Sequence, residues 1–111
     1  TCRCQYNNQG TWHNGIISDS KTTNGTSYYR FIEGKNCTDN GKRAIASKSE
    51  CTTASKSLSL LQPRLYDKRS QYYMNGCIYM SYHNQLYFND GNTNDGAFEK
   101  CKKDRECICK D

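Results

Sequence analysis

Eight cysteines are the residues whose type and spacing point most directly to chemistry. Two pairs, Cys2/Cys4 and Cys107/Cys109, form Cys-x-Cys motifs near opposite ends of the chain. Four thiolates brought together could bind zinc, but zinc sites favour Cys-x₂₋₄-Cys pairs that are held on turns. In an extended strand, Cys-x-Cys instead sends both sulfurs to one face, where each can reach a different partner on covering helices and loops. The motifs therefore predict half-cystines, with no bound metal or cofactor.

The number and spread of the cysteines predict four disulfide bonds formed in an oxidising compartment. Only 34% of the 111 residues are apolar, so the hydrophobic core needs covalent support. The sequence alone does not choose among the possible pairings. The predicted half-cystines are Cys2, Cys4, Cys37, Cys51, Cys77, Cys101, Cys107 and Cys109.

Two sequons agree with passage through a secretory pathway. Asn24-Gly25-Thr26 and Asn36-Cys37-Thr38 predict glycan acceptors at Asn24 and Asn36. The chain starts at Thr1 without an apolar leader, so we expect a secreted protein whose signal peptide has been removed. No apolar run approaches the ~20 residues of a membrane-spanning helix. We expect a monomeric extracellular domain covering residues 1–111, with later translocation into a host cell as an option.

The histidines give little support for an enzyme. His13 follows Trp12 in a polar stretch, and His83 lies at a predicted hairpin turn, where imidazoles are usually solvated. No acid, base and nucleophile form a recognisable set around either histidine. We therefore predict no catalytic residues and a non-enzymatic protein.

One segment resembles the fungal guanyl-specific ribonucleases of the T1 type. The stretch "HNQLYFNDGNTNDGAFEKC" has a strand, Asn-Gln-Leu, a second strand, a glycine loop and Phe-x-x-Cys in the same order. It lacks the histidine that this family places after the second strand, and the Tyr-x-His and Glu-Phe-Pro elements are also absent. The resemblance implies a relative without catalytic activity.

The composition and the opening Cys-x-Cys are similar to those of small secreted cysteine-rich proteins of plant-associated fungi. That group includes effectors, avirulence proteins and killer toxins, and it implies a virulence or toxin function exerted by binding. The polar segment 7–50 departs from the compact killer-toxin pattern. The leading hypothesis is a secreted effector or toxin-like protein that binds a host or competitor macromolecule. A ribonuclease-like protein and a carbohydrate-binding module are the alternatives.

The elements that position these residues are predicted from periodicity and turn signals. Segments 11–17, 26–32 and 43–47 have strand character, which is compatible with a small β-meander or with a region that is mostly loop. Helical spacing predicts either two helices at 52–62 and 63–76 or one helix kinked at Pro63, and a further helix at 96–106. Alternation predicts a hairpin at 77–90 and short strands at Cys2–Tyr6 and 106–110. Together they predict an α+β fold of the split βαβ kind, an antiparallel sheet of about four strands covered by two to three helices, in which the terminal strands are neighbours.

The net charge of +5 favours encounters with anionic surfaces, nucleic acid or acidic polysaccharide. A host protein or receptor is the expected partner, with a glycan or an anionic surface as alternatives. Half-buried packing of the tyrosines and a solvated helix face for the lysines are the competing structural explanations. The candidate binding residues are Trp12, Tyr28, Tyr29, Arg30, Lys68, Arg69, Tyr72, Tyr73, Lys102, Lys103 and Arg105.

Overall fold

The structure, a computed structural model, describes residues 17–90 and 99–111. These residues form one α-helix and seven strands. The helix α1 spans Lys48–Ser57, and a short 3₁₀ helix, η1, spans Thr38–Asn40. The strands are β1 Ile17–Thr23, β2 Thr26–Phe31, β3 Arg43–Ala44, β4 Arg64–Lys68, β5 Gly76–Met80, β6 Gln85–Asn89 and β7 Glu106–Lys110.

All seven strands belong to one mixed sheet with the order β1-β2-β7-β5-β6-β4, and β3 pairs with β7 beside this path. The pairing of β4 with β6 is parallel, whereas the other pairings are antiparallel. The predicted α+β fold, with about four antiparallel strands and two to three helices, is therefore wrong. In its described part the protein is mostly β, with a single α-helix.

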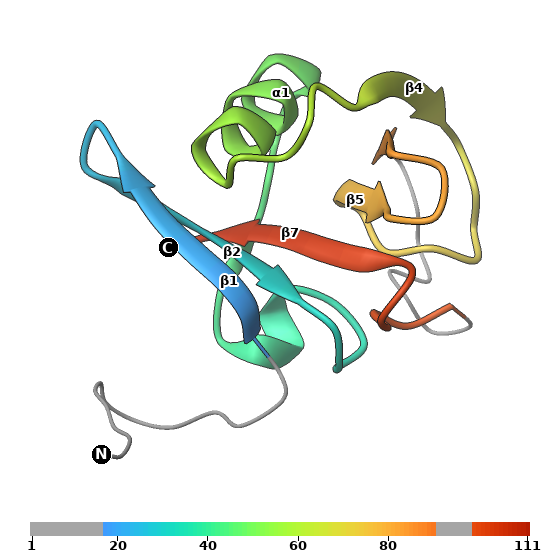
Figure 1. Cartoon of the computed structure of the whole chain (residues 1–111). Coiled ribbons are helices and arrows are strands. Elements are labelled where there is room, and N and C mark those ends of the chain that lie inside the picture. Colours follow the sequence, from blue (N-terminus) through green and yellow to red (C-terminus); the bar gives the residue numbers. More distant parts are fainter. Residues whose placement is uncertain (1–16, 91–98) are drawn as a thin grey trace.

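The two faces of the sheet are covered differently. Helix α1 lies on one side of β7, and the turn that contains η1 lies on the other (Figure 1). On the α1 side, Cys51, Ala54 and Leu58 of the helix region belong to a core cluster with Ile108 and other buried residues of the sheet. A second cluster, which contains Ile78 and the disulfides Cys37–Cys109 and Cys101–Cys107, occupies the opposite side. Successive side chains of a strand point to opposite faces of the sheet, so neighbouring residues contribute to different clusters.

Helix α1 begins four residues earlier than the predicted start at Thr52. Ser47 is the N-cap, and its hydroxyl accepts a hydrogen bond from the Glu50 amide at 3.1 Å. Ser-x-x-Glu is the sequence signature of such a start. The helix ends at Ser57, and the left-handed backbone of Ser59 (φ 60°) turns the chain away. Leu61, which falls within the helix predicted at 52–62, therefore lies outside α1 and is 83% exposed.

The predicted helix at 63–76 is also wrong, because residues 64–68 form the strand β4. The side chains of Arg-Leu-Tyr-Asp-Lys fit the alternation of a strand as well as the periodicity of a helix. Backbone pairing with β6 selects the strand. The loop after β4 ends at the glycine that begins β5. Gly76 adopts φ 109°, a conformation that other residues rarely adopt.

The predicted helix at 96–106 is contradicted over its described part, residues 99–106. Cys101 and Cys107 form a disulfide with a Cα–Cα distance of 5.4 Å. In an α-helix, residues six apart are separated by about 9 Å along the axis. The chain instead reverses in a turn, in which Lys102 and Arg105 exchange backbone hydrogen bonds of 3.0 Å.

The hairpin at 77–90 and the strand at 106–110 are confirmed as β5–β6 and β7. The predicted strand at 26–32 is confirmed as β2, which pairs with β1 through an Asn24-Gly25 turn. Of the predicted strand at 43–47, only Arg43–Ala44 pairs with the sheet. The predicted strand Cys2–Tyr6 and most of 11–17 lie outside the described residues.

Three disulfides join six of the predicted half-cystines: Cys37–Cys109, Cys51–Cys77 and Cys101–Cys107. Cys107 and Cys109 therefore do not serve as zinc thiolates. They also face away from α1, against our expectation, because their neighbour Ile108 occupies the α1 face. Cys2 and Cys4 lie outside the described residues. No helix in the described segments has the length and apolar character needed to cross a bilayer.

Candidate binding surface

Strands β4 and β6 place polar and aromatic side chains in register on the face opposite α1. Their parallel pairing aligns Arg64 with Gln85, Tyr66 with Tyr87, and Lys68 with Asn89. The intervening residues of β4 and β6 face α1, where Leu86 belongs to the core cluster and Leu65 packs against it. The sheet thus presents rows of functional groups on its other side.

Cations lie over tyrosine rings throughout this region. The Arg64 guanidinium carbon is 5.5 Å from the Tyr66 ring centroid. The Lys68 ammonium is 5.0 Å from the Tyr87 centroid and 5.3 Å from that of Tyr73. Tyr66 and Tyr87 meet edge to face, with centroids 5.9 Å apart. Cations within about 6 Å of a ring centroid are attracted by the ring quadrupole.

Arg105 completes the arrangement from the turn between Cys101 and Cys107. Its guanidinium carbon is 5.1 Å from the Tyr73 centroid, so Tyr73 contacts two cations. We call the whole set the tyrosine–cation face; it comprises Arg64, Tyr66, Lys68, Tyr73, Gln85, Tyr87 and Arg105.

The charge on this face is only partly neutralised. Arg105 forms an ion pair with Glu99. In the described segments, no carboxylate forms an ion pair with Arg64 or Lys68. The acidic residue between them on β4, Asp67, instead pairs with Lys48 of α1 at 3.1 Å. A cation–π contact positions a cation but leaves its net charge, so the face remains positive.

A buried asparagine at the end of β6 positions Tyr73. Asn89 is fully buried, and its Nδ2 lies 3.0, 3.2 and 2.9 Å from the carbonyl oxygens of Ser70, Tyr73 and Met74. Its Oδ1 accepts a hydrogen bond from the Ser70 amide at 2.8 Å. One side chain therefore fixes the loop that brings Tyr73 over β4 and β6.

Gln85 supplies neutral polar groups beside the cations. The Tyr87 hydroxyl donates to Gln85 Oε1 at 3.3 Å, and Gln85 Nε2 lies 3.5 Å from the Tyr66 hydroxyl. Both distances are at the long end of the hydrogen-bond range. The amide and the two hydroxyls can therefore exchange these contacts for a ligand.

The structure brings together three of the residues predicted from the sequence, Lys68, Tyr73 and Arg105. It adds Arg64 and Tyr66, which the helix predicted at 63–76 hid, and Gln85 and Tyr87, which the parallel partner strand β4 brings into the surface. The signal was present as alternation in Arg-Leu-Tyr-Asp-Lys and Gln-Leu-Tyr-Phe-Asn. No comparable signal identified Asn89.

Other predicted binding residues have structural contacts elsewhere. Tyr28 is 4% exposed, and its hydroxyl donates to Glu50 at 3.2 Å. Arg30 donates two hydrogen bonds, of 2.6 and 3.0 Å, to the buried Glu106 on the α1 face. Tyr29 donates to Asp111 at 2.9 Å. These contacts fasten β2, β7 and α1 together.

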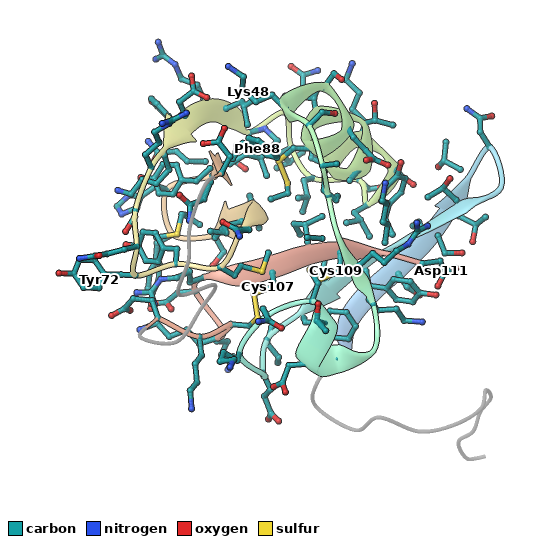
Figure 2. The ribbon with its side chains drawn as sticks, turned by 180° about the vertical axis from the view of Figure 1, so that it is seen from behind. Lys48, Tyr72, Phe88, Cys107, Cys109 and Asp111 are labelled. Carbon is teal, nitrogen blue, oxygen red and sulfur yellow. A yellow bond between two sulfur atoms is a disulfide. The ribbon has the colours of Figure 1, made fainter. Side chains whose placement is uncertain are left out.

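The remaining predicted residues that the structure describes are exposed but separate from the face. Arg69 pairs with Asp90 at 3.4 Å. Tyr72 is 50% exposed and projects away from the rest of the molecule (Figure 2). Lys102 and Lys103 line an open depression of about 620 Å³ with the exposed Tyr82. Trp12 lies outside the described residues.

The two predicted glycan acceptors differ in accessibility. Asn24 is exposed at the β1–β2 turn. Asn36 is only 8% exposed, and its Oδ1 accepts a hydrogen bond from the Asp39 amide at 2.8 Å. The folded chain therefore has room for a glycan at the first position and none at the second.

The perturbed titrating groups lie away from the tyrosine–cation face. Burial acts to raise the pKa of Glu50, but hydrogen bonding and charge from Lys110, with Tyr28, lower it overall. Burial, with the Glu50 charge, raises the pKa of Tyr28. Hydrogen bonds from Tyr29 and Lys42 lower the pKa of Asp111. These shifts are explained by contacts that hold the fold.

No protein-family model, curated protein or solved structure matches this chain.

Proposed function

We propose that this protein is a secreted, non-enzymatic binding protein of the effector or toxin-like kind, which captures an anionic macromolecule on the tyrosine–cation face. The observation that carries the proposal is the pair Arg64 and Lys68. Both cations lie over tyrosine rings, and neither has a carboxylate partner in the described residues.

The placement of these cations suits binding. Lysine and arginine side chains lose conformational entropy when a ligand immobilises them, which weakens association. The rings of Tyr66, Tyr73 and Tyr87 restrict the cations before any ligand arrives. The excess of basic residues over the whole chain adds a long-range attraction for anions.

Secretion is supported by the disulfides. Three disulfides in a small chain are typical of proteins that fold in an oxidising compartment. The effector or toxin class rests on the resemblance in composition and cysteine pattern.

The proposal is tested by retention on a polyanion such as immobilised heparin. The double variant Arg64→Ala/Lys68→Ala is compared with Lys21→Ala/Lys56→Ala, which removes the same charge from exposed positions on β1 and α1. We expect the first variant to elute at clearly lower salt, with the logarithmic salt dependence of binding reduced by about 1–2. The second should elute close to the unmodified protein. Equal shifts in both would show that only net charge matters and would refute the assignment of the face.

A further inference from the structure

We infer that the anionic partner is an acidic polysaccharide, whose charged groups bind Arg64 and Lys68 and whose hydroxyl groups bind Gln85 and the neighbouring tyrosine hydroxyls. This inference rests on the proposed function and specifies the chemistry of the ligand.

The cations are arranged for an extended ligand. Arg64 and Lys68 are four residues apart on β4, and at about 3.3 Å per residue their Cα atoms are about 13 Å apart. Tyr66 lies between them on the same side of the strand, and Lys68 also contacts Tyr73 beyond it. Anionic groups at intervals along a polymer can contact both cations and the tyrosine rings that lie between them.

Neutral groups beside the cations match sugar hydroxyls. A sugar hydroxyl both donates and accepts hydrogen bonds, and so do the Gln85 amide and the tyrosine hydroxyls. The contacts of Gln85 with Tyr66 and Tyr87, at 3.5 and 3.3 Å, are long enough to be exchanged for ligand contacts. An anionic polymer without hydroxyl groups would leave these neutral groups unused.

Single-stranded nucleic acid fits this face less well. Its bases bind by stacking on open aromatic rings. Here Lys68 lies over Tyr87, Arg64 lies over Tyr66, and the two rings meet edge to face. Stacked bases would have to displace the cations that should bind the phosphates.

The experiment compares three polymers of similar charge by isothermal titration calorimetry at fixed salt: oligogalacturonate, inorganic polyphosphate and poly(U). The variants are Gln85→Ala and Tyr87→Phe, which keep the charge of the face. We expect Gln85→Ala to weaken oligogalacturonate binding about tenfold and polyphosphate binding less than twofold. Tyr87→Phe, which retains the ring over which Lys68 lies, should show the same selectivity with a smaller loss. Thermal unfolding of each variant confirms that it is folded.

The outcomes separate this inference from the proposed function. Tighter binding of poly(U) than of oligogalacturonate would overturn the inference, as would equal losses for oligogalacturonate and polyphosphate. In either case Arg64→Ala/Lys68→Ala should still weaken all three polymers, and the proposed function would stand. If the unmodified protein binds none of the polymers, both proposals fail.

Discussion

Asn89 offers the sharpest test of how the fold positions the tyrosine–cation face. Its Nδ2 lies within hydrogen-bond distance of three carbonyl oxygens of the loop that carries Tyr73, and the side chain is fully buried. Asn89→Asp keeps the size of the side chain but replaces this donor by an oxygen. The change sets a buried carboxyl against three acceptors, with only the Ser70 amide left as a donor.

The expected loss is large for a single substitution. Leaving a buried polar group without a hydrogen bond costs about 1–3 kcal/mol, and more when a charge is involved. We therefore expect Asn89→Asp to lower the free energy of unfolding by about 3–5 kcal/mol at pH 7, compared with roughly 5–15 kcal/mol for a typical domain. The loop should loosen, and polyanion binding should fall even though no cation has been changed.

The loss should depend on pH with a defined sign. Burial among acceptors raises the pKa of the introduced carboxyl in the folded state. The penalty is therefore smallest below the unfolded pKa of about 3.9 and grows as the pH rises through the folded value. At pH values below the folded pKa, the protonated carboxyl can donate one hydrogen bond to the loop.

Urea unfolding followed by tyrosine and tryptophan fluorescence at pH 3, 5 and 7 measures these differences. Asn24→Asp, the same chemical change at the exposed β1–β2 turn, is the matched control and should cost less than about 0.5 kcal/mol. If the two variants lose equal stability, or if the Asn89→Asp deficit does not grow with pH, our account of the buried asparagine is wrong.

Three further predictions follow from other contacts. The pKa of Glu50 is lowered from its usual 4.5 although burial opposes this, so its contribution is present above that value and is lost as the pH falls through the lower folded pKa. Glu50→Gln should therefore flatten the acid side of a plot of Tm against pH, and an unchanged slope would contradict this. In a eukaryotic secretory host we expect one N-glycan, which Asn24→Gln abolishes and Asn36→Gln leaves in place, as read from the mass shift on enzymatic deglycosylation; a glycan on Asn36 would refute the accessibility argument. Gly76→Ala, at φ 109° with a new Cβ only 3.3 Å from neighbouring backbone and side-chain atoms, should lower the unfolding free energy by about 1–3 kcal/mol in thermal or urea unfolding. Gly25→Ala, whose Cβ would meet nothing within 4 Å, should cost less.

The sequence correctly predicted the elements whose local signals, alternation and turn residues, agree with the strand pairing of the sheet. The β5–β6 hairpin alternates clearly, and the Asn24-Gly25 turn needs the positive φ values that these residues tolerate. The cysteines were identified as half-cystines, and the six that are described pair in disulfides. Their pairing was beyond prediction because it depends on which strands become neighbours.

The two incorrect helix predictions, at 63–76 and 96–106, have a common physical origin. In residues 63–76, helical and alternating patterns overlap, and the parallel partner that selects β4 lies on β6, 21 residues further along at each pairing. In residues 99–106, the Cys101–Cys107 disulfide overrides a helical charge pattern. Because β4 was missed, Arg64 and Tyr66 were missed with it, and only part of the candidate surface was found.

The position of β7 has a consequence for how the chain is made. Among the described strands this one comes last in the sequence, yet it pairs with β2, β3 and β5. During synthesis, β7 must emerge from the ribosome before the two halves of the sheet can join. The β5–β6 hairpin can form early, because its strands are close in sequence. The Cys37–Cys109 bridge, across a separation of 72 residues, cannot close until β7 has emerged from the ribosome.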